Sequence, residues 1–176
     1  MKTYKEFMYE GNPLARVHSL SGKGRHFVTL STERPNISAE ERNRRNSELE
    51  TNLKKQGYGY RKVRGHYEGS TESSYLVHAK KEGAESGKRL VKDMAAHGRR
   101  YGQDTILHHN PETGKARLVG TNKTAGWIEF KKKKTIGNAI SYKSNPENQT
   151  EIRPKSTEKK LKPGRTPGSG KTFSIG

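Results

Sequence analysis

The sequence contains no cysteine and few apolar residues. The absence of cysteine excludes disulfide bonds and thiolate chemistry, which suits a cytosolic protein. Only 27% of the 176 residues are hydrophobic, too few to bury the whole chain, so part of it is expected to be disordered. No apolar run approaches the roughly 20 residues of a membrane-spanning helix, and the N-terminus lacks the apolar centre of a secretory signal. We therefore expect a soluble protein with no membrane partner.

Acidic residues are half as frequent as basic ones. The chain has 36 Lys and Arg against 18 Asp and Glu, a formal net charge of +18, and its pI is near 10.1. This balance implies a polyanionic partner, most commonly nucleic acid. Phosphate contacts need charge and not a fixed structure, so the expected binding is independent of base sequence.

Apolar periodicity divides the middle of the chain into strands and helices. In the first helix Ser38 and Glu41 have the spacing of a capping box, Gly57 marks the end, and Leu49 and Leu53 lie one turn apart. The βαββαββ order predicts an α+β fold with two helices packed on a mainly antiparallel sheet. The predicted elements are strand His26–Ser31, helix Ser38–Gly57, strands Tyr58–Tyr67 and Ser73–Ala79, helix Glu85–Tyr101, and strands Asp104–His109 and Lys115–Gly120.

Composition divides the chain into four regions. Residues 1–10 form a short amphipathic leader, residues 11–25 mix Pro, Gly, Ser and basic residues like a linker, and residues 26–130 hold the α+β domain. Residues 131–176 are rich in Lys, Pro, Gly, Ser and Thr and are predicted to be a disordered basic tail. Within the domain, Gly87 and Gly98 are expected to weaken the second helix.

The leader MKTYKEFMYE resembles the capsid-targeting sequence of the internal head proteins of T-even-type tailed phages. In that family the leader directs the protein into the prohead, where a protease cuts after a Glu that has an aliphatic residue two positions earlier. Met8, Glu10 and Gly11 fit this rule. The resemblance implies cleavage after Glu10, partners in the prohead core and its protease, and a location inside the virion and then in the host cytoplasm.

A looser resemblance covers about Phe27 to Gly120, which is similar to a small uncharacterised domain of bacterial and phage proteins. Its likeness is carried by Phe27–Ser31, Asn43–Leu53, Gly65–Val77 with Glu68 and Glu72, and Tyr101-Gly102-Gln103. This second resemblance implies no activity.

Residues for catalysis or metal binding are sparse in the sequence. The stretch Pro167–Thr172 fails as a phosphate loop because Arg165 stands where a glycine is needed. His108 and His109 are neighbours in a strand and point to opposite faces, so they cannot bind one metal together. Glu68 and Glu72, near His66, are candidates for acid/base work, although such residues more often pair with Arg. We therefore predict no catalytic residue, no metal and no cofactor.

The nucleic-acid-binding residues are predicted among the clustered Lys and Arg side chains. Those on the first helix have an alternative interpretation, a solvated face balanced by nearby Glu residues. The predicted set is Arg42, Arg44, Arg45, Arg61, Lys62, Arg64, Lys131, Lys132, Lys133, Lys134, Lys159, Lys160, Lys162, Arg165 and Lys171.

The main hypothesis from sequence is a phage internal head protein and not an enzyme. It is packaged and injected with the phage DNA, binds nucleic acid non-specifically, and counteracts a host defence protein such as a nuclease. Two alternatives stay open: a cytoplasmic nucleic-acid-binding accessory protein with no virion role, and a small enzyme built on the α+β domain.

Overall fold

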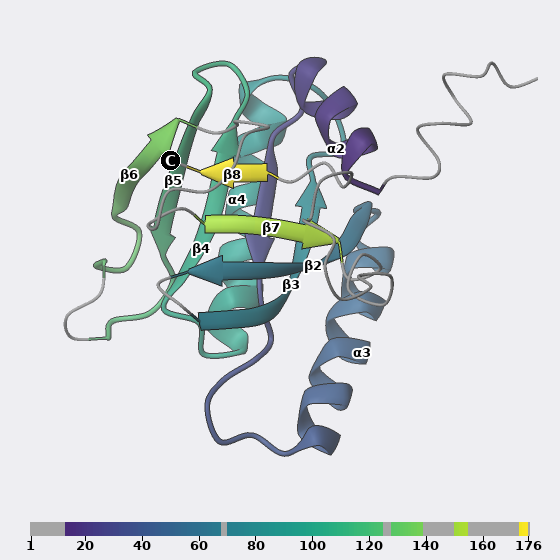
Figure 1. Cartoon of the computed structure of the whole chain (residues 1–176), viewed down its shortest axis with the longest axis vertical. Helices are drawn as coiled ribbons and strands as arrows, with labels where there is room; N and C mark the ends of the chain where they lie inside the picture. Colours follow the sequence, from purple (N-terminus) through teal and green to yellow (C-terminus); the bar gives the residue numbers. More distant parts are fainter. Residues whose placement is uncertain (1–12, 68–69, 125–127, 139–149, 155–172, 176) are drawn as a thin grey trace, which may run out of the picture.

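The computed structural model describes residues 13–67, 70–124, 128–138, 150–154 and 173–175. Within these ranges three helices accompany a single sheet (Figure 1). The elements are α2 (Pro13–Gly22), β1 (Phe27–Leu30), α3 (Ala39–Lys55), β2 (Tyr60–Tyr67), β3 (Ser70–His78), α4 (Ala84–Arg100), β4 (Thr105–Asn110), β5 (Lys115–Gly120), β6 (Lys133–Asn138), β7 (Thr150–Pro154) and β8 (Phe173–Ile175).

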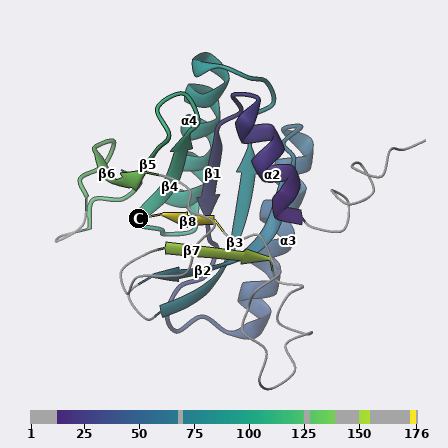
Figure 2. The same cartoon turned by 45° about the horizontal axis from the view of Figure 1, so that its top comes forward.

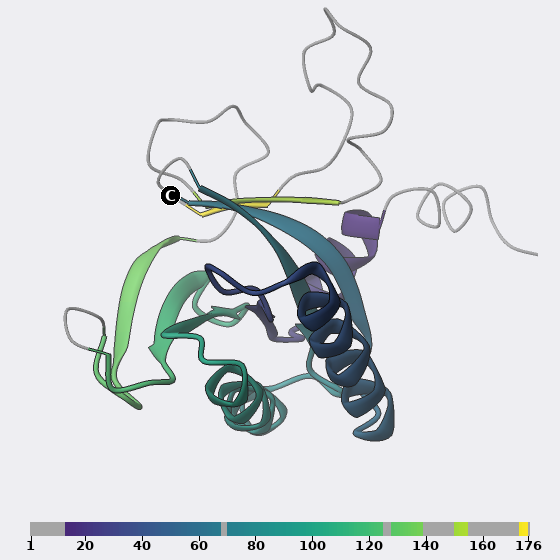
Figure 3. The same cartoon turned by 90° about the horizontal axis from the view of Figure 1, so that it is seen from below.

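The sheet has the order β6-β5-β4-β1-β3-β2-β7-β8, and its strand pairs are antiparallel. The main helices α3 and α4 lie side by side on one face of this sheet (Figure 3). The predicted α+β class, with two helices on a mainly antiparallel sheet, is therefore confirmed. No helix in the described ranges is long and apolar enough to cross a membrane.

Alternation along the central strands builds a core on each face of the sheet. Val28 and Leu30 of β1 face the two main helices, where they pack with Leu53 of α3 and Met94 of α4. Phe27, the residue before Val28, packs on the other face. All four residues of β1 are buried because both faces of this central strand are covered.

Helix α3 begins and ends where its capping residues predict. The Ser38 side chain accepts a hydrogen bond from the Glu41 backbone N–H at 3.1 Å, which satisfies one of the free donors of the first turn. Gly57 follows the helix with φ +74, a left-handed conformation that glycine adopts without strain. Leu49 and Leu53 are both fully buried, as their spacing predicts.

Two glycines of α4 allow close packing rather than merely weakening the helix. A Cβ at Gly87 would lie 2.5 Å from the His26 ring, and one at Gly98 would lie 3.0 Å from Ile106. The helix can therefore approach β1 and β4 more closely than one with larger side chains at these positions. Helix propensity predicts that each glycine lowers the stability of the helix, but it does not predict which residue packs against the glycine.

The region predicted as a linker contains helix α2. Val17 of α2 is fully buried and packs against Phe27 and Leu76, on the face opposite α3 and α4. Figure 2 shows α2 in front of β1 and β3 in this position. A helix this short and polar is marginal by itself and depends on this docking for its stability, so the sequence pattern does not reveal it.

The region predicted as a disordered tail contributes the strands β6, β7 and β8. Strand β6 pairs with β5, and β7 pairs with both β2 and β8. Edge strands are held by backbone hydrogen bonds and need few apolar residues, so composition does not reveal them. Nearby, Phe130 makes one isolated parallel bridge to Gly120.

Candidate functional site

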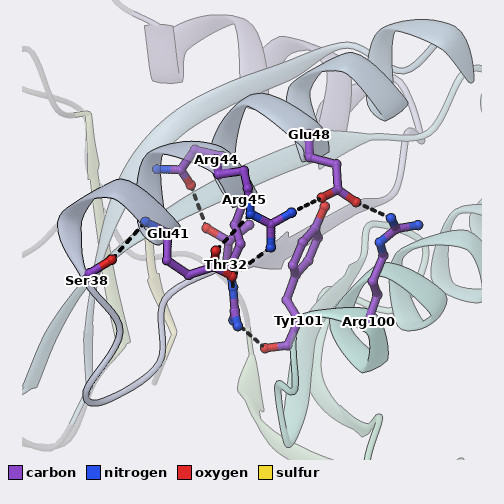
Figure 4. Close-up of polar contacts among 9 residues, drawn as sticks. Thr32, Ser38, Glu41, Arg44, Arg45, Glu48, Arg100 and Tyr101 are labelled. Carbon is purple, nitrogen blue, oxygen red and sulfur yellow. Dashed lines mark hydrogen bonds and ion pairs between the residues drawn. The ribbon is translucent and has the colours of Figure 1, made fainter.

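The predicted basic face of α3 is neutralised by carboxylates of the same helix (Figure 4). Glu41 accepts hydrogen bonds from Arg44 at 2.8 Å and from Arg45 at 2.6 Å. These hydrogen bonds from the two guanidinium groups lower the pKa of Glu41 to about 2. Arg44 also pairs with Glu48 at 3.3 Å. The pairs match the alternative of a solvated, balanced face, while nucleic-acid binding by these arginines stays a prediction.

The same network connects α3 to the end of α4. Glu48 forms an ion pair with Arg100, and Arg45 donates a hydrogen bond of 3.4 Å to the Tyr101 carbonyl (Figure 4). Thr32, which follows β1, donates to the Asn46 side chain at 2.5 Å. The predicted DNA-binding face is thus also the contact between the two main helices.

The other predicted basic residues lie in several places. Arg42 lies 3.6 Å from Glu33 and Lys62 lies 2.7 Å from Glu50, whereas Arg61 is exposed. Arg64 is opposite Ser73 in the sheet register, and its side chain is outside the described set. Four consecutive exposed lysines run into β6. They are Lys131, Lys132, Lys133 and Lys134.

Several predicted residues lie outside the described ranges. For the leader these are the cleavage residues Met8, Glu10 and Gly11, so no structural observation tests the cut. Glu68 is also outside, and the His66 side chain is not described. The remaining basic residues outside these ranges are Lys159, Lys160, Lys162, Arg165 and Lys171.

Three buried histidines, His26, His108 and His109, make polar contacts within the fold. His108 and His109 point to opposite faces, as predicted: His108 lies 3.0 Å from His26, and His109 lies 3.4 Å from Ser21 of α2. Burial and the neighbouring His26 lower the pKa of His108 to about 3, so the ring is neutral. In the described part of the chain, no group of three His, Cys, Asp or Glu side chains is placed to hold a metal ion.

Glu33, which follows β1, is an electrostatic neighbour of Glu72 in β3, and Arg34, the residue after Glu33, pairs with Asp104 just before β4. We call Glu33, Glu72 and Asp104 the acidic edge. The backbone N–H of Ser73, next to Glu72, donates to the Glu33 carboxylate at 3.3 Å. Shielding of its carboxyl from water, followed by the charge of Glu33, raises the pKa of Glu72 even though much of the side chain is exposed.

Hydrogen bonds fix the loops that carry the acidic edge. Asp104 accepts from Arg34 at 3.1 Å and from Thr124 at 2.6 Å. The next residue back, Gln103, accepts from the backbone of Ser31 at 2.9 Å. Three loops distant in sequence are thereby held together. No ion pair joins Glu72 to any basic side chain within the described ranges, which distinguishes it from Glu33 and Asp104.

Apart from the acidic edge, the carboxylate of Glu50 in α3 lies among aromatic rings. Tyr75 donates to it at 2.8 Å and Tyr60 at 3.1 Å, and Lys62 lies 2.7 Å away. Burial alone would raise the pKa of Glu50, but these hydrogen bonds and the Lys62 charge hold it below its usual value. Three partners already occupy this carboxylate, so it joins α3 to the sheet and leaves little capacity for a ligand.

A raised carboxyl pKa in a group of carboxylates is a feature of acid/base and cation-binding sites. Fold and site therefore define a small α+β protein with an acidic candidate site, which is compatible with an enzyme. A family model described as the S-adenosylmethionine lyase family matches residues 28–161, and the chain belongs to this family. Among curated proteins no sequence matches the chain.

Family membership corrects the functional hypotheses drawn from sequence. The main hypothesis of a phage internal head protein with no enzymatic activity is wrong, because the matched family is one of lyases and spans most of the chain. The open alternative of an enzyme on the α+β domain is the one that the match supports. The second resemblance, over about Phe27 to Gly120, overlaps the matched range of residues 28–161 only in part, and its interpretation as a domain without known activity is wrong.

The range matched by the family model includes the acidic edge but not the whole histidine pair. It contains Glu33, Glu72 and Asp104 but excludes His26 and all of α2. The acidic edge is therefore the better candidate site for a family activity than the histidine pair. Glu72 was a candidate from sequence, whereas Glu33 and Asp104 were missed because only folding brings their loops to Glu72.

Proposed function

We propose that this protein is a lyase that cleaves S-adenosylmethionine. The observation that carries the proposal is the family match over residues 28–161, which includes the two main helices and the central strands. The acidic edge is the part of the described structure whose chemistry suits this substrate best.

S-adenosylmethionine carries both reacting groups itself. Its sulfonium is a cationic leaving group, and a C–S bond can break without water or an electron acceptor. In one route the substrate's own carboxylate attacks the γ-carbon, which releases methylthioadenosine and homoserine lactone. In the other a base removes the β-proton, which releases methylthioadenosine and vinylglycine. Neither route needs a protein nucleophile or a metal, so the absence of such motifs from the sequence was not evidence against an enzyme.

The acidic edge supplies what these routes require from a protein. A carboxylate about 4 Å from the sulfonium attracts it by roughly 4 kcal/mol near a protein surface, and the substrate ammonium adds a second cation for a second carboxylate. Arg34, beside Asp104, offers a cation for the substrate carboxylate. Glu72, whose pKa is raised by shielding from water and by Glu33, is our candidate for the group that takes a proton in the elimination route.

The test is to incubate the full chain with S-adenosylmethionine and identify the products by mass spectrometry. We expect methylthioadenosine together with either homoserine lactone or vinylglycine. Glu72→Gln should lower kcat/KM by at least about 10²-fold, because it removes a carboxylate that we propose stabilises the reacting cation. The matched control is Glu85→Gln on the exposed first turn of α4, which should leave the rate unchanged. Equal rates for both variants would remove the acidic edge from the proposal.

Cleavage of S-adenosylmethionine would affect every methyl transfer in the same cell. An effect on host functions would then follow from loss of a metabolite and would not require contact with a host defence protein. Such an enzyme acts where its substrate is present, which agrees with the predicted host cytoplasm. The predicted stage inside a virion depends on the leader, which lies outside the described residues.

A further inference from the structure

The predicted basic residues differ in how far carboxylates compensate them. Helix α3 has five basic and four acidic side chains; Arg44 and Arg45 are paired with Glu41 and Glu48, and Arg42 is paired with Glu33. The segment from Lys115 to Lys134 instead contains seven basic residues and one acidic residue, Glu129. Uncompensated positive charge is therefore concentrated at β5, β6 and the connection between them.

Six residues form the surface that we call the basic ridge. Its four lysines are all exposed, and the ion pair found for them in the described structure is a long one, 4.0 Å from Lys132 to Glu129. The ridge comprises Arg99, Phe130, Lys131, Lys132, Lys133 and Lys134.

Phe130 organises two cations of the ridge. The Arg99 guanidinium lies 4.8 Å from the centre of the Phe130 ring, and the Lys131 ammonium lies 5.3 Å from it. Cation–π contacts of this kind hold a cation in place without neutralising it. Arg99, from the end of α4, is thereby brought beside a lysine that lies far from it in sequence.

The ridge follows an edge of the sheet. Strand β6 is the terminal strand beyond β5 (Figure 1). Lys133 pairs with Val119 and Lys134 with Leu118, so their side chains project to opposite faces of this edge. Lys131, with φ +64, and Lys132 lie in the turn before β6, and Lys133 and Lys134 begin the strand. The four lysines thus bring positive charge from one turn and one strand edge to a short stretch of surface, where it can meet more than one phosphate of a nucleic acid.

We propose that the basic ridge binds the phosphate backbone of nucleic acid without reading its base sequence. The proposal is independent of the lyase activity, because it uses the β6 edge and not the acidic edge. Of the basic residues predicted from sequence to bind nucleic acid, the proposal keeps Lys131, Lys132, Lys133 and Lys134. In the described structure the ion pair found for these lysines is the 4.0 Å contact between Lys132 and Glu129.

The test measures binding of the full chain to a fluorescent duplex DNA of mixed sequence over a range of salt concentrations. In the variant K131Q/K132Q/K133Q/K134Q affinity should fall about 10-fold or more. The slope of log K against log salt should become shallower by about two to three, since Lys133 and Lys134 project to opposite faces and each phosphate contact contributes about 0.9. Phe130→Ala should give a smaller loss in the same direction because it frees Arg99 and Lys131.

The matched control is K23Q/K54Q/K55Q/K81Q, which removes four exposed lysines elsewhere and changes the net charge equally. It should keep most of the affinity and of the salt slope. Equal losses in both variants would show that only total charge matters and would overturn the proposal. So would stronger binding to anionic phospholipid vesicles than to DNA, or a ridge variant that aggregates while binding DNA normally, as expected if the lysines only protect the sheet edge. Retained cleavage of S-adenosylmethionine in the ridge variant keeps the two proposals separate.

Discussion

The α3 face and the acidic edge both carry several charged side chains, but they use them differently. On α3, Arg44 and Arg45 are bonded to Glu41, and Arg44 also to Glu48. At the acidic edge Glu72 has another carboxylate, Glu33, as its electrostatic neighbour, and its pKa is raised. The α3 pairs neutralise one another along the helix, and Glu48 also reaches α4, through Arg100. The raised pKa of Glu72, which the opposing charge of Arg34 only partly offsets, is the better sign of function.

The largest expected difference between these regions is in catalysis. Glu33→Gln removes a carboxylate from the acidic edge and should lower kcat/KM for S-adenosylmethionine by about 10²-fold. It also removes a negative charge near Glu72, so the pKa of Glu72 should fall and the acidic limb of the rate profile should move to lower pH. Glu41→Gln is the matched control, and an equal loss of activity there would erase the distinction.

Acidification should lower the stability of the fold through its buried histidines. The pKa of His108 is about 3 in the folded protein, against about 6.5 when unfolded, so the unfolded chain binds a proton first as pH falls below about 6.5. Between pH 7 and pH 5 this single group should lower the free energy of unfolding by about 2 kcal/mol. His26 shifts in the same direction, while Glu72, with its raised pKa, acts in the opposite one.

Urea denaturation at pH 7 and pH 5 measures this change. His108→Gln should flatten the pH dependence, because glutamine can keep a hydrogen bond to His26 but does not titrate. An unaltered pH dependence in this variant would assign the acid sensitivity to other groups.

An effect of similar size is expected from the packing of α4 on the histidine pair. Gly87→Ala places a Cβ 2.5 Å from the His26 ring and should cost about 1–3 kcal/mol of stability through overpacking. Gly22→Ala is the control, because no atom lies within 4 Å of its added Cβ. Thermal unfolding that ranks the two variants equally would contradict this packing.

The smallest effect belongs to the α3 face itself. Arg44→Gln breaks exposed ion pairs to Glu41 and Glu48, and such pairs contribute little in water. We expect a melting temperature close to that of the wild type and unchanged cleavage of S-adenosylmethionine. A large loss of activity would mean that the α3 arginines do more than pack two helices.

Sequence patterns predicted much of the fold and little of the site. The Ser38 cap, the buried Leu49 and Leu53 and the opposed His108 and His109 follow from local periodicity, which the chain itself determines. Helix α2 and strands β6 to β8 were missed because docking and backbone pairing hold them, and neither leaves a strong apolar pattern.

The acidic edge depends on contacts between distant loops. Arg34 and Asp104 are 70 residues apart in sequence, and only the folded chain shows that they meet. The activity was missed for a chemical reason, since the search for a nucleophile, a metal site or a phosphate loop does not detect an enzyme whose substrate carries its own leaving group. The ten-residue leader resembles another family, but it covers far less of the chain than residues 28–161, which match the lyase family.

The most direct test of the central claim is a single turnover of the full chain with S-adenosylmethionine in water enriched in ¹⁸O. Mass spectrometry would then locate the label in the four-carbon product. A lyase breaks the C–S bond without water, so we predict methylthioadenosine and a partner product with no ¹⁸O on its γ-carbon. Homoserine with ¹⁸O in its γ-hydroxyl would show hydrolysis, and the absence of any cleavage product would contradict the assignment of a lyase.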